Sequence, residues 1–376
     1  MLKKQNTMKV LTIVGTRPEL IKLSQVIKKL DTTCEHILVH TGQNYDYELN
    51  EVFFKDLGIR KPDYFLECAE ENFAYTISNI IRKSYDLLLK VKPDAFLIYG
   101  DTNSCLSVMS AKRLKIPIFH MEAGNRCFDE RVPEEINRKM IDHLSDINLT
   151  ISDHAKSYLE KEGLPPNRII KVGSSMDEVL NIQKKQINES IIVDKLGLTN
   201  NGYFVVSIHR EENVDSEDKL TSIVESLNEI TTVFNKVAIF SIHPRTKMRL
   251  KQFNLESKLN DKVIKMKPLG FNDYIKLQKD SFCTISDSGT ISEEASLLNF
   301  PAITIRETHE RPEAMDEGTI IMSGLDKKNI VNSIKVVTSN LNFQVTKDYI
   351  SPSLSSKIIK IIFSYTDYVN TYVWRK

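Results

Sequence analysis

The sequence predicts an α/β fold of two doubly wound domains, each built on a parallel sheet. Short β-branched runs alternate with longer helical patterns along nearly the whole chain, and the alternation starts again after a polar region at residues 181–202. Near-continuous apolar strands between helices are typical of parallel sheets that helices cover on both faces. The length of 376 residues also exceeds what one ordinary hydrophobic core holds, which favours two domains.

The expected strands are short apolar segments. In the first half of the chain they cover residues 9–14, 37–40, 95–99, 116–119 and 147–151. In the second half they cover residues 204–208, 237–242, 263–266, 283–286 and 302–305. The segments between them have helical patterns: Leu20, Leu23, Ile27 and Leu30, for example, repeat at three-to-four spacing and predict a helix with one buried face.

We expect the first domain to cover residues 8–171 and the second to cover residues 172–351. Residues 352–376 carry apolar and aromatic side chains in a helical pattern, which predicts a terminal helix that packs back on the first domain. In doubly wound folds ligands bind beyond the carboxyl ends of the strands. We therefore expect the two strand edges to face one inter-domain cleft.

Composition excludes several classes of protein. A formal net charge of +1 gives no reason to expect nucleic acid or an anionic membrane as a partner. No apolar stretch approaches the roughly 20 residues that a membrane-spanning helix needs, and no signal-peptide segment opens the chain. The five cysteines are scattered and form no CxxC pair. They indicate reduced thiols in the cytoplasm, and neither a disulfide framework nor a zinc site.

Polar clusters follow several of the expected strands. After the first strand, Thr16 and Glu19 have capping-box spacing, which predicts that a helix begins there. The free backbone amides of that helix start, with Arg17 and Lys22, suit a phosphate group. The alternative is an ordinary helix cap with solvated charges.

Several carboxylates follow two of the expected strands. Asp101 follows the strand at 95–99, and Glu122 lies in the run HMEAGNRCFD, ahead of Pro133, Glu134 and Glu135. Carboxylates are poor core material, and between a strand and a helix they suit proton transfer. The bland alternatives are that Asp101 caps the next helix, that Glu122 pairs with Arg126 or Arg138, and that the acids after Pro133 begin a helix.

The second half has its own strand-end clusters. His209 ends one strand, and the run SDSGTISEE predicts a strand, a tight turn and a helix, with Thr290 and Glu293 at capping-box spacing. Ser288, Gly289 and Thr290 then lie where backbone amides would cradle a diphosphate. Glu294 could accept hydrogen bonds from ribose hydroxyls. The chain has no P-loop or GxGxxG fingerprint, which disfavours ATP and dinucleotides.

Six motifs in order resemble the non-hydrolysing UDP-N-acetylglucosamine 2-epimerase family: GTRPELIK, GDTNS, HMEAGNR with PEEINR, HREEN, SDSGTISEE and RETHERPEA. Together they cover nearly everything from Lys9 to about residue 340. The resemblance implies two Rossmann-like domains in the arrangement of B-type glycosyltransferases, with the site between them. It also implies a UDP-sugar substrate, no cofactor, no metal and a homodimer.

The resemblance assigns roles to individual residues. As catalytic groups it implies Asp101, Glu122, Glu134 and His209. As substrate-binding groups it implies Arg17, Lys22, Asn125, Arg126, Tyr274, Ser288, Gly289, Thr290, Glu294 and Arg311. Of these, Tyr274 lies in the uracil region, where the match to the family is loose.

One loop departs from the common pattern. Where common 2-epimerases read EAGLRTGD and then a short loop to PEE, this chain reads EAGNRCFDERVPEE. That variant resembles the branch that converts UDP-2-acetamido-2,6-dideoxy-L-talose to UDP-N-acetyl-L-fucosamine for capsule or O-antigen precursors. Asn125, Cys127 and Phe128 are then candidates for reading the 6-deoxy-L-sugar.

Other functions stay open. The nearest is a UDP-N-acetylglucosamine 2-epimerase that interconverts UDP-GlcNAc and UDP-ManNAc by the same mechanism. More distant alternatives are a glycosyltransferase of the B-type fold, a hydrolysing 2-epimerase and a non-enzymatic nucleotide-sugar sensor.

Overall fold

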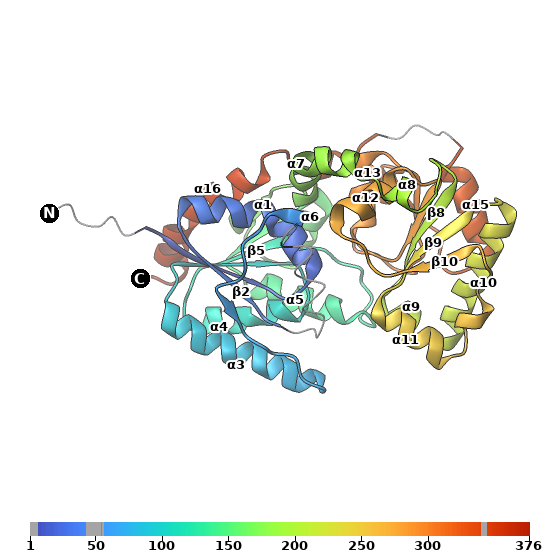
Figure 1. The fold of residues 1–376 in the computed structure, drawn as a ribbon. Helices are drawn as coiled ribbons and strands as arrows, with labels where there is room; N and C mark the ends of the chain where they lie inside the picture. Colours follow the sequence, from blue (N-terminus) through green and yellow to red (C-terminus); the bar gives the residue numbers. More distant parts are fainter. Residues whose placement is uncertain (1–6, 43–53, 55, 340–343) are drawn as a thin grey trace. The chain divides into compact units, whose positions relative to one another are not determined.

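A computed structural model describes residues 7–42, 54, 56–339 and 344–376 (Figure 1). The chain divides into two compact units, one formed by Met1–Ile182 with Asp348–Lys376 and the other by Gln183–Lys347. The division falls inside helix α7 (Ser175–Glu189), later than the boundary at residue 171 expected from the sequence. This helix carries the chain from one unit to the other, so no break in pattern marks the boundary.

The first unit is built on a parallel sheet of seven strands in the order β3-β2-β1-β4-β5-β6-β7. Its strands are β1 (Lys9–Val14), β2 (Glu35–His40), β3 (Tyr64–Phe65), β4 (Ala95–Tyr99), β5 (Ile118–Ala123), β6 (Ile147–Thr150) and β7 (Ile169–Lys171). The chain leaves β1 towards one edge of the sheet and β4 towards the other. This reversal makes a switch point, beyond which such sheets bind ligands.

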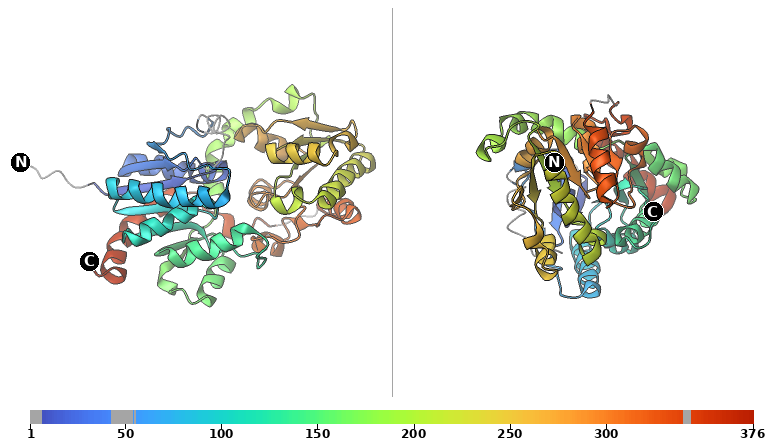
Figure 2. Two further views of the ribbon diagram at one scale, coloured as in Figure 1. Left: turned by 90° about the horizontal axis from the view of Figure 1, so that it is seen from below. Right: turned by 90° about the vertical axis from the view of Figure 1, so that its right-hand side faces the viewer.

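Helices cover both faces of this sheet (Figures 1 and 2). On one face α1 (Arg17–Thr33) lies against the C-terminal helix α16 (Leu354–Tyr368). On the other lie α3 (Phe73–Val91), α4 (Val108–Arg113) and α5 (Pro133–Leu144). The remaining helix between β6 and β7 is α6 (Asp153–Lys161). The predicted buried face of this helix is confirmed, because its four apolar residues are fully buried: Leu20, Leu23, Ile27 and Leu30.

The second unit repeats the design with six parallel strands in the order β10-β9-β8-β11-β12-β13. Its strands are β8 (Tyr203–Ser207), β9 (Val237–Ser241), β10 (Val263–Met266), β11 (Cys283–Ser286), β12 (Ala302–Thr304) and β13 (Ile321–Met322). Its helices are α8 (Ile192–Lys195), α9 (Glu211–Val214), α10 (Glu217–Val233), α11 (Pro244–Gln252), α12 (Phe271–Lys279), α13 (Ile291–Leu298), α14 (Pro312–Asp316) and α15 (Lys327–Val337).

Strand residues of the second unit alternate between two apolar layers. Phe204 and Val206 of β8 pack on the side of α10 and α15. Tyr203 and Val205 pack on the opposite side, with apolar residues of α8 and α12. Because successive strand side chains point to opposite faces, an all-apolar strand needs helices on both sides.

All ten expected strands are present, and the predicted fold class is confirmed. Three strands are absent from the sequence prediction: β3, β7 and β13, which have only two or three residues each. Such short segments carry too few apolar positions to show a period of two.

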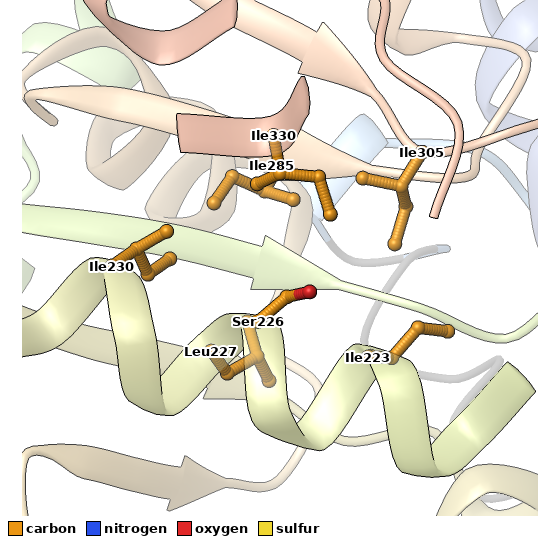
Figure 3. A pocket seen from close by; sticks show the side chains of 7 residues that line it. All are labelled: Ile223, Ser226, Leu227, Ile230, Ile285, Ile305 and Ile330. Carbon is orange, nitrogen blue, oxygen red and sulfur yellow. The ribbon is translucent and has the colours of Figure 1, made fainter. Parts of the chain in front are cut away.

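A small apolar cavity lies in the core of the second unit (Figure 3). Its lining comes from α10, α15, β11 and the end of β12, and consists of Ile223, Ser226, Leu227, Ile230, Ile285, Ile305 and Ile330. The only hydroxyl in this lining belongs to Ser226, and it donates to the carbonyl of Ser222 on its own helix. The cavity therefore offers a ligand no polar partner and is a feature of core packing.

Truncation of a residue in this lining tests the packing. Ile230 is fully buried, and Ile230→Ala is expected to lower the free energy of unfolding by about 2–5 kcal/mol, because the enlarged cavity cannot collapse. Val233 on the same helix is 46% exposed, so Val233→Ala is the control and should change stability by less than about 0.5 kcal/mol. Urea unfolding measures both, and equal losses in the two variants would contradict the packing described.

Candidate active site

The end of β5 brings the carboxylate of Glu122 into contact with two donors in the first unit. Lys22 of α1 donates from Nζ to Oε2 of Glu122 over 2.5 Å, and the Tyr99 hydroxyl donates to the same oxygen over 2.6 Å. Only 4% of the Lys22 side chain and 11% of the Glu122 side chain are exposed. Such short hydrogen bonds in a poorly solvated place fix the orientation of the carboxylate.

The backbone at Glu122 departs from regular strand geometry. Its φ is +66°, in the left-handed region, and the pairing of β5 with β6 shifts register at this residue. Gly124 follows with φ of +82°, and a Cβ there would lie 2.4 Å from the carbonyl oxygen of Ala155. Glycine is therefore required at this position, and the bulge re-aims the Glu122 side chain.

Asp101, directly after β4, is bonded to helix α5. Arg138 Nε donates to Asp101 Oδ2 over 2.7 Å, and Asn137 Nδ2 donates to the Asp101 carbonyl over 2.9 Å. The next helical turn, Asn103–Ser107, has Thr102 as its N-cap residue, so the alternative in which Asp101 caps that turn is wrong. Arg138 holds the carboxylate beside the switch point instead.

The two acids that begin α5 have different surroundings. Glu135 is fully buried and accepts hydrogen bonds from the backbone amides of Cys127 and Phe128, both over 3.0 Å, and from Arg138 over 2.9 Å. Burial alone would raise the pKa of Glu135, but these hydrogen bonds outweigh it and hold the pKa below its usual range. Glu135 thus shapes the variant loop, whereas Glu134 is half-buried at the start of the helix.

Arg126 lies in the interior and bonds to carboxylates of the fold. Its guanidinium donates to Asp142 over 2.7 Å and to Glu162 over 2.8 Å, and its side chain has no exposed surface. In this structure Arg126 therefore supports the loop, and the substrate contact expected of it from the sequence stays a prediction. The salt-bridge partner that Glu122 shows is Lys22, while Arg126 and Arg138 are bonded to other carboxylates.

Asp142 and His120 form a buried pair that the sequence analysis missed. His120 Nδ1 lies 2.9 Å from Asp142 Oδ1, and His120 Nε2 lies 3.0 Å from the carbonyl of Gly100. The amide of Gly124 donates to the Asp142 carboxylate over 3.2 Å. The pair therefore connects the loop that contains Asp101 to the strand end that carries Glu122. A usable signal was that Asp142 lies seven positions after Glu135, on the same face of α5.

Glu19 is a second missed residue, since the sequence predicts it only as the partner of Thr16 in a capping box. It does accept from Thr16 Oγ1 over 3.1 Å, and from the Gly15 amide over 2.6 Å. It also accepts hydrogen bonds from Thr102 and Ser104, which follow β4. Burial raises the pKa of the Glu19 carboxyl to about 7, against the lowering effect of these bonds. Helix α1 begins at Arg17 as predicted.

In the second unit a buried aspartate organises the loop after β8. The Asp287 carboxylate accepts from the amides of His209, over 3.0 Å, and Arg210, over 2.9 Å. Asn213 Nδ2 donates to it over 3.1 Å, and His209 Nδ1 lies 3.3 Å from Oδ1. Asp287 therefore fixes both the backbone and the ring of His209, whose side chain is 36% exposed.

The turn after β11 departs in detail from the predicted capping box. Thr290 is the N-cap residue of α13, but its side chain makes no capping hydrogen bond and lies 3.0 Å from the Ser288 hydroxyl. Glu293 is fully buried and pairs with Arg311 over 2.8 Å. The capping-box prediction for Thr290 and Glu293 is therefore wrong, because a tertiary ion pair takes the glutamate away from the helix end. Arg311 is 2% exposed, and in this structure its side chain is held in the interior by the ion pair with Glu293.

Gly289 sits at the crowded point of that turn. A Cβ at Gly289 would lie 2.5 Å from Oε1 of Glu310, so a side chain there would displace the end of the Glu310 side chain. Glu294, one turn into α13, is 6% exposed and accepts from Gln278 Nε2 over 2.9 Å. Tyr274 on α12 is partly buried, and desolvation raises the pKa of its hydroxyl with a smaller contribution from the charge of Glu294.

The remaining predicted residues lie in the first unit. Arg17 begins α1 and is half-buried. Asn125 is 4% exposed, and Cys127 is bonded through Sγ to Glu135 over 3.3 Å. Phe128 is 69% exposed and packs edge-to-face on Tyr158. Of the three candidates for reading the sugar, Phe128 is thus the one whose side chain is open to solvent.

The described part of the chain has neither a membrane-spanning helix nor a metal-binding cluster. None of its helices is long and apolar enough to cross a membrane. Within the same residues, no group of three or more His, Cys, Asp and Glu side chains could hold a metal ion.

Each unit therefore carries polar groups at the switch point of a doubly wound sheet. The first brings together carboxylates paired with Lys22 and Arg138, and the second brings together His209 and a glycine turn at a helix start. Carboxylates and a helix start at such strand edges are typical of α/β enzymes, in which these groups transfer protons and bind anions.

Comparisons with known proteins agree. A family model described as UDP-N-acetylglucosamine 2-epimerase matches residues 28–363. The chain is 37% identical over 343 residues to the UDP-N-acetylglucosamine 2-epimerase of Methanocaldococcus jannaschii, covering 88% of this chain and 92% of the relative. It is also 37% identical over 334 residues to the UDP-2,3-diacetamido-2,3-dideoxy-D-glucuronate 2-epimerase of Pseudomonas aeruginosa, with 87% and 92% covered.

A solved structure is similar over nearly the whole chain. It is that of the UDP-N-acetylglucosamine 2-epimerase from Rickettsia bellii, with a TM-score of 0.91 and 52% identity, covering 98% of this chain and 100% of that one. The chain belongs to the UDP-N-acetylglucosamine 2-epimerase family. The predicted resemblance is confirmed at that level, and the protein is a carbohydrate epimerase.

The raised pKa of Glu19 generates a prediction about stability. The ordinary pKa is 4.5 and the folded value about 7, so between these values the folded protein keeps a proton that the unfolded chain releases. The free energy of unfolding should therefore fall as pH rises from about 4.5 to about 7, by up to about 3 kcal/mol from this group. Glu19→Gln lacks this titration, so its stability relative to wild type should rise across that window.

Urea unfolding at pH 5, 6, 7 and 8 measures the difference. The control is Glu189→Gln, whose side chain is 64% exposed on α7, and which should change stability little at any of these pH values. If the free energies of unfolding of wild type and Glu19→Gln differ by the same amount at every pH, Glu19 does not titrate in this window.

Proposed function

We propose that this protein is a 2-epimerase of a UDP-2-acetamido sugar and that UDP-N-acetylglucosamine is its substrate. The observation that carries the proposal is the Glu122 carboxylate, bonded to Lys22 and Tyr99 at the switch point of the first unit. The substrate follows the names of the relatives from Methanocaldococcus jannaschii and Rickettsia bellii.

Chemistry explains why such a site needs carboxylates. C2 of a 2-acetamido sugar has no adjacent carbonyl, so removal of its proton alone would leave an unstabilised carbanion. If the C2–H electron pair forms a C1–C2 double bond while the C1–O bond breaks, the negative charge leaves with UDP. Return of a proton to the other face of C2, as UDP adds back at C1, inverts that centre. Both steps need a positioned acid or base.

In this proposal Asp101, Glu122 and Glu134 supply the proton-transfer groups. Two faces of C2 must be served, which suits carboxylates that reach the substrate from different elements. Asp101 comes from β4, Glu122 from β5 and Glu134 from α5. Arg138 holds the Asp101 carboxylate in place by an ion pair, and Lys22 holds the Glu122 carboxylate in the same way.

The second unit supplies the nucleotide-binding groups. The amides around Gly289 and the start of α13 would hold the diphosphate, since a helix start attracts anions and no side chain blocks the turn. His209 would stabilise or protonate the leaving diphosphate, and Glu294 would accept from the ribose hydroxyls. Tyr274 would lie by the uracil and Arg311 by the nucleotide, while Arg17 and Lys22 of the first unit contribute positive charge.

A second candidate substrate is UDP-2-acetamido-2,6-dideoxy-L-talose. The loop sequence NRCFDER at residues 125–131 favours it, and in that loop the exposed ring of Phe128 could pack on a 6-methyl group. The names of the relatives support UDP-N-acetylglucosamine better, and the Pseudomonas aeruginosa relative is named for a third sugar. The substrate must therefore be decided by assay.

The assay gives the purified protein each UDP-sugar separately in D₂O and follows C2 by proton NMR. We expect inversion at C2 with deuterium incorporation, and UDP-N-acetylglucosamine as the preferred substrate. A preference for the L-talose sugar would transfer the proposal to the second candidate. Transfer of the sugar without deuterium at C2 would indicate a glycosyltransferase, and free sugar with UDP a hydrolysing enzyme.

Substitution of the carboxylates tests their role. Asp101→Asn and Glu122→Gln should each lower kcat by about two orders of magnitude or more, because the amide cannot accept the proton, while UDP binding is largely kept. The control is Glu35→Gln at the start of β2, whose side chain is 57% exposed. Turnover near the wild-type rate in both site variants would overturn the assignment.

A further inference from the structure

Tyr99 contacts the Glu122 carboxylate from inside the sheet. It is the last residue of β4, is 3% exposed, and donates its hydroxyl proton to Oε2 of Glu122 over 2.6 Å. The same hydroxyl lies 3.5 Å from Oγ of Ser175, at the start of α7. A tyrosine with a buried ring and a hydroxyl held by polar contacts at its tip has almost no freedom to move.

Lys22 completes a compact cluster with these two residues. Its Nζ donates to Oε2 of Glu122 over 2.5 Å and lies 5.4 Å from the centroid of the Tyr99 ring. The ammonium group is thus attracted both by the carboxylate and by the face of the ring. Tyr99 therefore holds the cation as well as the carboxylate.

Glu122 needs such support. A residue other than glycine with φ of +66° has a strained backbone, and neighbouring contacts must maintain it. The two donors reach one oxygen, Oε2, from α1 and from β4, and so fix the direction of the carboxylate plane.

We propose that Tyr99 is a positioning residue for 2-epimerisation, whose hydrogen bond to Glu122 holds that carboxylate in the direction that proton transfer at C2 of the sugar requires. This inference rests on the proposed function, because it assigns the orientation of a carboxylate that the reaction uses. In the step concerned, the C2–H bond breaks and its proton joins the Glu122 carboxylate. The C–H electron pair forms the C1–C2 double bond, and the C1–O pair leaves with UDP.

The test compares two variants that each remove one buried tyrosine hydroxyl. Tyr99→Phe keeps the ring and removes only the hydroxyl, and with it the hydrogen bond to Glu122. The control is Tyr203→Phe in the second unit, where the fully buried tyrosine donates to the carbonyl of Leu277 over 2.9 Å. The two changes are matched in burial and in the loss of one hydrogen bond, so both should cost similar stability.

The readouts are kcat, KM and the rate of deuterium exchange into C2 of the substrate. Tyr99→Phe should lower kcat and the exchange rate roughly 10- to 100-fold, with KM and UDP affinity within about twofold of wild type, because a misaimed carboxylate impairs only the chemical step. Tyr203→Phe should keep both rates within about twofold.

Each outcome decides between the two levels of the proposal. If the wild-type protein exchanges deuterium into C2 and Tyr99→Phe does so at the same rate, the role of Tyr99 is overturned and the proposed function stays intact. Equal losses in both variants, or a loss confined to KM, would show that the hydroxyl serves only stability or binding. Absence of C2 exchange in the wild-type protein, with either UDP-sugar, would overturn the proposed function and this inference with it.

Discussion

The buried carboxylate of Asp142 is the interaction on which the geometry of the first unit depends. It lies on α5 with no exposed surface and binds His120, Arg126 and the amide of Gly124. Burial alone would raise its pKa, but the bonds to His120 and Arg126 hold the pKa below the usual range, so the carboxylate stays charged. Removal of one partner would leave a charge in the interior, which is costly. The loops of β4 and β5 are therefore fixed by electrostatics as much as by strand pairing.

Asp287 serves the second unit in a similar way. It too is fully buried, and it accepts the amides of the loop after β8 and a side-chain amide from α9. In both units one carboxylate from a neighbouring element satisfies amides that the end of a strand leaves without a sheet partner. This is why polar loops at the switch points can be rigid without being apolar.

The sequence predicted what depends on local pattern and missed what depends on pairing in space. Ten strands were predictable because they are near-continuous apolar runs, whereas β3 is two residues long and shows no period. The carboxylates at the ends of β4 and β5 were predictable because acids are rare beside buried strands. The partners of the buried acids were not predictable. Glu293 has capping-box spacing yet pairs with Arg311, and Glu19 also accepts a hydrogen bond from Thr102 after β4. Such choices are set by tertiary neighbours, which spacing along the chain does not encode.

Gly124 also limits where this enzyme can change during evolution. Because the main chain there lies close to the carbonyl of Ala155 on α6, any larger residue would push the strand end and that helix apart. The segment between Gly124 and α5 is also held near its start by Glu135, through the amides of Cys127 and Phe128, so changes in length fit best between Phe128 and α5. Insertions there would change the loop while Glu122 keeps its place. A family with one reaction and several sugars could diversify in this way, with the proton-transfer group inherited unchanged.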